Sequence, residues 1–425
     1  MLENYIQMMY AKGMDRAILH SDLNNFYASV ECLLHPELRG KSVVVCGSIE
    51  DRHGIVLAKN MKAKKAGVTT GMTMFEAQRL CPDLIGVEAN FDTYLDYSHR
   101  VRNIYLEYTN QVEPFGIDEA WLDVTCCLRA YGSAEKVARE IKERVKKEIG
   151  VTVSIGVSFN KVFAKLGSDM KKPDAITVIS RENFQSLIWP LPAKELLYVG
   201  RKTAEKLQKL NICTIGDLAR ANRGLLEQHL GKWGGYLHTY ASGQDIAPVR
   251  KYDERTEIKS VGNSMTFYKD IVNNNEAECL VYVLAESVAA RMREYGFCRA
   301  RTITLTIVAN TLEHTTRMMK MQPPASTSKE IAEYAMVLFK KHHSWQNLVR
   351  GLGISVSDFL AQEQLCMGES VIMREKTETL EKTVEQLRNR FGRNSVLRGV
   401  VLQDAKLSST NVKETHVIHP VSFKK

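Results

Sequence analysis

The sequence predicts an α+β protein of several domains, in which a helical part separates two segments of order β-α-β-β-α-β. Apolar runs typical of strands alternate with amphipathic helices in the first 180 residues. The same order of elements returns after residue 250, whereas residues 181–243 contain no strand pattern. A chain of 425 residues is long enough for two to four domains.

The first segment is predicted to form a split β-α-β sheet. The expected strands are 17–22, 112–115, 120–125 and 151–157, and the expected helices are 26–34 and Ser133 to Gly150. In the second of these helices one apolar face recurs every four residues, at Val137, Ile141, Val145 and Ile149. A compact insertion runs from residue 36 to about residue 90 and is followed by an amphipathic helix near 91–109. Neither the insertion nor this helix is counted in the β-α-β-β-α-β order.

The remaining chain is predicted to hold a helical part, a second α+β part and a tail. Residues 181–243 look like short helices joined by Gly and Asn, and the stretch 190–192 (PLP) marks a hinge into them. The second β-α-β-β-α-β order comprises 256–267, 275–295, 299–309, 313–321, 327–342 and 348–357. From about residue 361 we expect one amphipathic helix near 375–391 and a polar end.

Composition is that of an ordinary soluble globular protein, with 44% hydrophobic and 25% charged residues. The net charge of +9 is compatible with binding to nucleic acid without being diagnostic of it. No apolar run approaches the roughly 20 residues that span a bilayer, and the first residues lack a basic start and an apolar signal core. The nine cysteines form no Cys-x-x-Cys pair, so we expect free thiols and a cytoplasmic protein.

Three acidic residues in two places carry the most chemical information. Asp22 ends the apolar run 18–22, while Asp118 and Glu119 adjoin the run 120–125. The predicted hairpin places the pair beside the strand that carries Asp22, and neighbouring carboxylates repel in a folded core unless cations or protons intervene. Mg²⁺ prefers carboxylate and phosphate oxygens, and two such ions suit phosphoryl transfer. The alternative is that Asp118-Glu119 simply marks a turn.

Three motifs together resemble those of Y-family (DinB/UmuC-type) translesion DNA polymerases of bacteria. They are 22–31 (DLNNFYASVE), 116–123 (GIDEAWLD), and 154–158 (SIGVS) followed by 163–166 (FAKL) and 168–173 (SDMKKP). Their order and separations fit, and the order of domains fits to about residue 360.

The resemblance implies a right-hand polymerase with a split β-α-β palm, small fingers, a helical thumb and a β-α-β-β-α-β little finger. In this sequence the parts would be palm 1–25 and 90–180, fingers 26–89, thumb 181–243, little finger 252–360, and a tail 361–425. No stretch is left over for a proofreading nuclease, so the implied synthesis is of low fidelity and serves DNA damage tolerance and the SOS response.

The resemblance also assigns roles at the site. Asp22, Asp118 and Glu119 would be the catalytic metal ligands, with the Leu23 backbone carbonyl, for two Mg²⁺ ions or alternatively Mn²⁺. Among the nucleotide-binding residues, Tyr27 beside Phe26 matches the steric gate that excludes a ribose 2′-hydroxyl; the alternative is an aromatic core residue. Lys172 and Lys64 match triphosphate-binding positions, although 62–65 (KAKK) is equally a basic surface run.

Four positions depart from the family pattern. Many members carry Tyr and Arg where this chain has Met61 and Lys64, so the grip on the triphosphate is expected to differ, because Met donates no hydrogen bond and Lys offers a point charge. Gly116 and Trp121 stand for the commoner Ser and Phe or Tyr, which changes the shape of the site and leaves its charges intact.

Contacts to DNA and to a partner are expected outside the palm. A helix-hairpin-helix-like stretch at 199–207 would offer Gly200, Arg201 and Lys202 to phosphates, although its usual first glycine is Tyr198. Arg299 and Arg301, two residues apart on one predicted strand, would share a face.

The tail resembles a sliding-clamp-binding peptide at Gln364, Leu365 and Met367. Gly368 stands where the terminal aromatic is usual, and the alternative is a linker with accidental similarity. The helix that follows has Leu380, Val384, Leu387 and Phe391 on one face, which should pack on the protein or meet another partner.

The leading interpretation is therefore a Mg²⁺-dependent, template-directed DNA polymerase that uses primer-template DNA and deoxynucleoside triphosphates. We expect it to act as a monomer in the bacterial cytoplasm, at the nucleoid. One alternative is a catalytically inactive relative that only binds DNA or partner proteins, but all three carboxylates are present. Another is a nucleotidyl cyclase, which would not need the thumb-like and little-finger-like parts.

Overall fold

The computed structural model describes residues 15–47, 54–254, 257–360, 371–392, 395–404 and 406, and for 371–375 it describes the backbone alone. The described residues fall into two compact units. The first lies mainly within Ile55–Arg255 and the segment before Gly47, and the second mainly within Thr256–Val417. Within the described residues, no helix is both long and apolar enough to cross a membrane.

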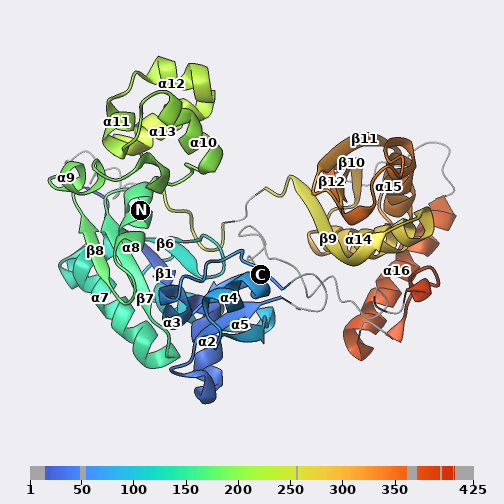
Figure 1. Cartoon of the computed structure of the whole chain (residues 1–425), viewed down its shortest axis with the longest axis horizontal. Coiled ribbons are helices and arrows are strands. Elements are labelled where there is room, and N and C mark those ends of the chain that lie inside the picture. The colour runs from blue at the N-terminus through green and yellow to red at the C-terminus, as the bar shows by residue number, and fades with distance from the viewer. Residues whose placement is uncertain are drawn as a thin grey trace. The chain divides into compact units, whose positions relative to one another are not determined.

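The first unit is built on a five-stranded sheet of order β5-β6-β1-β7-β8 (Figure 1). Its central strand β1 (Ile18–Leu23) pairs antiparallel with both β6 (Glu119–Asp123) and β7 (Val153–Ser158). The edges are β5 (Val112–Pro114) and β8 (Ile176–Ile179), the latter parallel to β7. The predicted split β-α-β sheet is therefore confirmed, with β8 added beside its fourth strand.

Helices cover both faces of this sheet, which is why β1 is buried along its whole length. On one face α5 (Phe91–Leu106) and α7 (Ala134–Arg144) pack with Leu19 and Leu23 of β1. The predicted helix to Gly150 continues beyond α7 as a wider π-helical turn, Val145–Ile149. On the other face α8 (Lys161–Met170) lies so close that a Cβ on Gly156 would sit 1.9 Å from the Ala164 carbonyl oxygen.

A smaller lobe interrupts the sheet between β1 and α5. It begins with α2 (Phe26–Leu34), whose predicted bounds are confirmed, and the short 3₁₀ turn Pro36–Leu38. A three-stranded sheet of order β3-β2-β4 follows, with its own apolar core. Its elements are β2 (Val43–Cys46), β3 (Val56–Lys59), α3 (Met61–Lys65), α4 (Met74–Leu80) and β4 (Ile85–Glu88).

A cluster of short helices completes the first unit: α9 (Phe184–Ile188), α10 (Arg201–Lys209), α11 (Ile215–Arg220), α12 (Arg223–Leu230) and α13 (Lys232–Ala241). Phe163 and Leu166 of α8 belong to the same core as these helices. The extended segment after α13 then returns to the five-stranded sheet. There the Arg250 guanidinium donates to Glu113 at 3.0 Å, and the Tyr252 amide donates to the Asn110 carbonyl.

The second unit is a four-stranded antiparallel sheet of order β11-β10-β12-β9. The strands are β9 (Ser260–Ile271), β10 (Arg299–Ala309), β11 (His314–Ala325) and β12 (Val349–Leu360). The predicted order of elements is confirmed, with α14 (Asn274–Glu294) and α15 (Ser328–His342) in the expected places. The strand order differs from that of the first sheet, because the fourth strand lies between the first and the second.

The two faces of this second sheet differ in chemistry. Ile303, Leu305 and Ile307 of β10 are buried in one core with α14 and α15. The alternate residues Thr302, Thr304 and Thr306 are half-buried on the other face. Their cross-strand neighbours there are also largely small or polar, namely Thr316, Lys320, Gly353, Ser355 and Ser357.

The C-terminal part of the second unit adds α16 (Val371–Phe391) and a short 3₁₀ turn, Val401–Gln403. The helix predicted near 375–391 is confirmed and begins four residues earlier than expected. Val401 is buried in the core of α14 and α15, so this segment belongs to the unit (Figure 1).

Candidate active site

The three carboxylates gather where β1 ends and β6 begins. Asp22 is the cross-strand partner of Glu119, and Asp118 immediately precedes β6. The Leu23 amide donates to the Asp118 carbonyl oxygen at 3.0 Å, which fixes the end of β1 against the turn that carries Asp118. The sequence prediction that these residues meet is therefore confirmed, and the hairpin register is its cause.

Two lysines from the α8 region bridge the carboxylates. Lys165 Nζ lies 2.8 Å from Glu119 Oε2 and 3.3 Å from Asp22 Oδ2, and Lys172 Nζ lies 2.7 Å from Asp22 Oδ2. Asp169 joins both lysines, at 3.2 Å from Lys165 and 2.9 Å from Lys172. Acidic residues of two strands and basic residues of one helix and its following loop thus form a single ion network.

The pKa values in this network follow from burial and from neighbouring charge. Burial, then Glu119 and then Asp22 raise the pKa of Asp118 to about 7. Burial and Glu119 also raise the pKa of Asp22, against the opposing effect of the lysines. Burial alone would lower the pKa of Lys165, but Glu119, Asp22 and Asp169 together raise it. The site therefore carries more negative charge than its two lysines neutralise.

A buried histidine lies beside Glu119 within the sheet. His20 is fully buried; its Nδ1 lies 2.8 Å from the Ser168 hydroxyl, and its Nε2 lies 3.3 Å from Glu119 Oε2. Burial and then Lys165 hold the pKa of His20 well below its usual value, so the ring is neutral. Trp121, which departs from the family pattern, packs edge-on against the His20 ring, with 5.1 Å between the ring centroids. It therefore lines the interior of the site.

The turn before β6 is held from α5. Gly116 has φ of +88°, a conformation that favours glycine. Arg102 donates to the Gly116 carbonyl at 2.8 Å, and the Ser98 hydroxyl donates to the Ile117 carbonyl. A small hollow behind Asp118 is lined by these side chains and Tyr105, so α5 fixes the direction in which Asp118 points.

Sequence reasoning missed Lys165, Asp169 and His20 as members of the site. The available signal was spacing: Lys165, Asp169 and Lys172 follow one another at intervals of four and three residues, which places them on one side of α8 and its end. His20 stands two residues before Asp22 on β1, so both side chains point to the same face of the sheet.

Tyr27 lies at the start of α2, half-buried, next to the carboxylates. Its ring stacks on that of Tyr94 at 4.4 Å and 13°, and it meets Phe91 edge-on. Burial and then the charge of Asp118 raise the pKa of its hydroxyl. Phe26 is fully buried and packs against Tyr27 and Tyr94. Tyr27 therefore combines packing with a position near Asp118, whereas Phe26 acts as a core residue here.

The two predicted triphosphate lysines differ in position. Lys172 contacts Asp22, as described above, whereas Lys64 is exposed on α3. Within the described part of the chain no ion pair joins Lys64 to an acidic residue. Burial lowers the pKa of Lys59, and the charge of Lys64 lowers it further. Lys62, in the same basic run, donates to the Gly40 carbonyl at 2.9 Å.

In the hairpin before α10, Tyr198 adopts the left-handed backbone conformation that is usual for glycine. Tyr198 has φ of +71° and Asn211, after α10, has φ of +57°. A tyrosine in this left-handed region is strained, and its ring packs on Trp233 at 5.6 Å. Gly200 is the N-cap of α10, and Arg201 and Lys202 are exposed at its first turn.

The two predicted DNA contacts on β10 differ in exposure: Arg299 is buried and Arg301 is exposed. Beside them the pairing of β10 with β11 is irregular, because Ala300 pairs with Ala325 but Thr302 pairs with Lys320, which leaves the extra residues on β11. The prediction of a phosphate contact therefore fits Arg301 and not Arg299. The candidate partner residues Gln364, Leu365 and Met367 lie outside the described residues.

The donor set fits divalent cations, although its present arrangement is one of ion pairs. Among the described residues, no three His, Cys, Asp or Glu side chains are arranged around a common point. Asp22, Asp118 and Glu119 are hard oxygen donors, and burial together with their mutual repulsion raises the pKa of Asp118 and of Asp22. Displacement of the two lysine ammonium groups would free Asp22 and Glu119 to bind a cation.

Comparison with known proteins places the chain in one family. Residues 21–169 match the impB/mucB/samB family and residues 258–367 match the impB/mucB/samB family C-terminal domain. A DNA polymerase IV of Acetivibrio thermocellus is 50% identical over 93% of this chain and 100% of its own length. A DNA polymerase IV 1 of Bacillus subtilis is 37% identical over 94% of this chain and 97% of its own length.

A solved structure agrees with these relatives. A Y-family DNA polymerase chimera matches with a TM-score of 0.72 and 25% identity, over 81% of this chain and 100% of its own length. The fold and the carboxylate site thus define a multi-domain α+β polymerase. The chain belongs to the impB/mucB/samB family, the bacterial DinB-type branch of the Y-family DNA polymerases.

Proposed function

We propose that the protein is a translesion DNA polymerase in which Asp22, Asp118 and Glu119 carry the nucleotidyl transfer. Its family membership makes it a DNA-directed DNA polymerase. The observation that supports the assignment of these residues is the convergence of three carboxylates at adjacent ends of β1 and β6, beside two lysines. A protein that only bound DNA would have no use for a charge cluster of this cost.

The parts of the chain take the corresponding roles in this proposal. The palm is the five-stranded sheet, within residues 1–25 and 90–180, and the fingers are residues 26–89. The helical cluster 181–243 is the thumb. The second unit holds the little finger, which starts after Tyr252, because that residue packs with the core of the first unit. The tail begins at residue 361.

Enzymes of this family generally use divalent metal ions, and we assign two Mg²⁺ ions, with Mn²⁺ as an alternative, to Asp22, Asp118, Glu119 and the Leu23 carbonyl. When bound, they would neutralise the developing charge on the attacking and leaving oxygens. The chain's own residues do the positioning. The β1–β6 register places Asp22 opposite Glu119, and Lys165 pairs with Glu119 at 2.8 Å.

Nucleotide selection falls to residues at the edge of this site. Lys172 is a point charge that follows α8 and pairs with Asp22 and Asp169, and it is suited to an incoming triphosphate once it leaves Asp22. Tyr27 offers a flat ring, fixed by stacking on Tyr94, which would leave no room for a 2′-hydroxyl. Lys64 would contribute charge from the fingers.

Primer-template DNA would be held through its phosphates. Candidate contacts are Gly200, Arg201 and Lys202 at the start of α10, and the small polar face of the second sheet with Arg301. Hydroxyl and backbone groups on a flat face bind phosphates without reading sequence. The peptide around Gln364, Leu365 and Met367 remains a predicted sliding-clamp contact for an otherwise monomeric enzyme of the bacterial cytoplasm and nucleoid.

Primer extension tests this proposal directly. Asp118→Ala or Glu119→Ala should abolish deoxynucleotide addition in Mg²⁺, whereas binding to primer-template DNA should persist, because phosphate contacts come from other residues. The matched control is Asp123→Asn at the other end of β6, which should stay active if it folds. Near wild-type extension by the Asp118 and Glu119 variants would show that the assignment is wrong, and extension that needs no divalent ion would exclude the metal role.

A further inference from the structure

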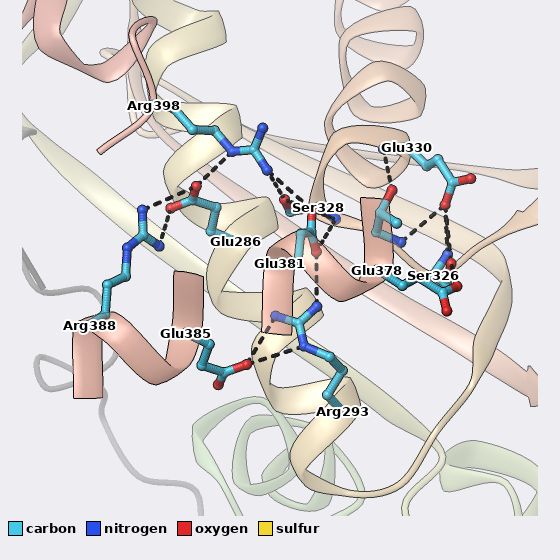
Figure 2. Close-up of polar contacts among 11 residues, drawn as sticks. Glu286, Arg293, Ser326, Ser328, Glu330, Glu378, Glu381, Glu385, Arg388 and Arg398 are labelled. Atoms are coloured by element: carbon cyan, nitrogen blue, oxygen red, sulfur yellow. Dashed lines mark hydrogen bonds and ion pairs between the residues drawn. The ribbon is translucent and has the colours of Figure 1, made fainter. Parts of the chain in front are cut away.

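The C-terminal helix α16 is attached to its unit through its polar side. Glu381 is buried and accepts hydrogen bonds from the Ser328 amide at 2.9 Å and from the Ser328 hydroxyl (Figure 2). This caps the N-terminus of α15, where a negative charge is favoured. Arg293 of α14 reaches Glu381 at 2.9 Å and Glu385 at 3.1 Å.

The segment after α16 extends the same network. Arg398 lies 3.1 Å from Glu381 and 2.7 Å from Glu286, and Arg388 lies 3.0 Å from Glu286 (Figure 2). Glu378 accepts from the Ser326 hydroxyl at 2.7 Å. Each acidic side chain described on α16 therefore points toward α14, α15 or their loops and has a partner there.

The apolar side of α16 is the side left open. Leu380 and Phe391 are each 62% exposed and Leu387 is 38% exposed. They follow one another at intervals of seven and four residues, so they form one stripe along the helix. Val384, on the same side, is half-buried. Of the two expectations for this face, packing on the protein therefore does not hold for Leu380 and Phe391, and contact with another partner stays a prediction. The ion network attaches α16 to the unit, so its exposed apolar residues are not needed for this attachment.

The charges around this stripe have one sign. Lys376 and Arg390 are exposed beside it, and Arg390 lies over the Phe391 ring at 5.0 Å. Since Glu378, Glu381 and Glu385 face the other way, the charged groups described beside the stripe are basic, and its other exposed neighbour, Thr383, is uncharged. A second copy would meet like charges here, and a nucleic acid would not bury Leu side chains. Acidic groups with apolar anchors complement both features.

We infer that the stripe Leu380, Leu387 and Phe391, flanked by Lys376 and Arg390, is a docking surface for an acidic protein segment with apolar anchors. The anchors would cover the stripe, and the acidic residues would pair with the two cations. Such a helix-in-groove or helix-to-helix contact depends on a few buried anchors. The surface uses residues other than the carboxylates of the first unit and other than the predicted peptide Gln364, Leu365 and Met367.

The test uses the full chain and a labelled synthetic helical peptide with Leu at i, i+4 and i+7 and Glu at the other positions. Leu380→Ser with Phe391→Ser should weaken its binding at least about tenfold, as expected for loss of two anchors. Lys376→Glu with Arg390→Glu should weaken it similarly, whereas Lys382→Glu, on the other side of the helix, should not. Val337→Ser, an exposed apolar residue on α15, is the matched control and should bind as the wild type does.

Several outcomes would overturn the inference: no binding of the Glu peptide, equal binding of a peptide with Lys in place of Glu, or unchanged binding by the stripe variants. Loss of duplex DNA affinity in the stripe variants would assign the face to nucleic acid instead, and self-association removed by them would assign it to a second copy. Primer extension and thermal unfolding of the stripe variants should match the wild type. If the double variant fails to fold, Leu387→Ser is measured in its place.

Discussion

Asp118 is the residue at which the folded state of the site penalises negative charge most. Its pKa is raised to about 7, by burial first and then by Glu119 and Asp22, against about 3.9 in an unfolded chain. The folded protein therefore holds this proton more tightly than the unfolded chain does. Stability from the protonated group is fully present below pH 4 and is lost as the pH rises through about 7.

We expect this titration to be visible in thermal unfolding without divalent ions. In a chelator, the Tm of the wild type should fall between pH 5 and pH 8 by more than the Tm of Asp118→Asn, which carries no titrating proton. With Mg²⁺ present, the stabilisation by the ion should grow over the same range, because the ion competes with the proton. Parallel pH profiles of the two proteins in chelator would contradict the assigned pKa.

Tyr27 gives a second prediction at the scale of single residues. Tyr27→Ala removes the ring that is stacked on Tyr94, and ribonucleotide incorporation relative to deoxynucleotide incorporation should rise at least about tenfold, the equivalent of a 1.4 kcal/mol clash. Tyr27→Phe keeps the ring and should keep the discrimination. Single-nucleotide insertion kinetics with each sugar measure the ratio, and an unchanged ratio in Tyr27→Ala would make the residue a packing residue.

Sequence could predict the three carboxylates but only part of their surroundings. The hairpin of β5 and β6 is a local feature, but Asp22 meets Glu119 through the pairing of β1 with β6, which joins distant segments and was predicted from the order of the elements. The contact of Lys165 with Glu119 depends on how closely α8 approaches the sheet, which is set by packing between distant segments. Arg299 shows the limit of alternation, since it is buried whereas Arg301, two residues further on the same strand, is exposed.

At the scale of elements, the approach of α8 to β7 is set by Gly156. Gly156→Ala would place a methyl group 1.9 Å from the Ala164 carbonyl oxygen and 2.6 Å from the Ser168 amide, so α8 must move. We expect destabilisation of about 3 kcal/mol, the upper end of overpacking costs, together with loss of activity through displaced Lys165. Gly200→Ala, where nothing lies within 4 Å of the new atom, should leave stability nearly unchanged. Chemical unfolding measures both.

The attachment of α16 gives a matching prediction in the second unit. Glu381→Gln leaves Arg293 and Arg398 without their shared charge. It should destabilise the unit by about 3 kcal/mol, the lower end for one partner of a buried ion pair, because both arginines are partly exposed. Lys382→Gln, its exposed neighbour, should have little effect. Equal unfolding midpoints for the two variants would show that the network adds nothing to stability.

Element positions were predictable, whereas their connections in space were less so. The bounds of α2 and β10 agree with the predicted 26–34 and 299–309 because apolar periodicity is a local signal. The strand order β11-β10-β12-β9 is not local, and the same order of elements gives a different sheet in each unit. The apolar side of an amphipathic helix usually faces the core. In α16 the acidic side faces the core instead, because ion pairs and hydrogen bonds take the place of apolar contacts.

At the scale of the whole molecule, the two units have separate apolar cores. Damage to one core need not affect the other. We therefore expect Gly156→Ala to leave the second unit folded and Glu381→Gln to leave the first unit folded. Hydrogen exchange resolved along the chain would show each effect confined to its own unit.

The last prediction concerns DNA binding, for which the proposed contacts lie in both units. Binding should be largely independent of sequence and should weaken steeply with salt, because phosphate contacts release counterions. Arg301 is exposed and Arg299 is buried, so the two should behave differently. Arg301→Ala should flatten the slope of log affinity against log salt by about 0.9, the value for one phosphate contact. Arg299→Ala should lower the stability of the second unit instead.

The measurement is fluorescence anisotropy of a labelled primer-template over a range of salt concentrations, with unfolding of each variant followed in parallel. Arg201→Ala with Lys202→Ala tests the start of α10 in the same way, and a change of up to about 1.8 is expected for two contacts. Arg39→Ala, on a side chain that donates to the Cys32 carbonyl in the fingers lobe, is the control and should leave the slope unchanged. If Arg301→Ala leaves the slope unchanged while Arg299→Ala flattens it in a stably folded protein, the DNA contacts a face of the second unit other than the one that Arg301 marks.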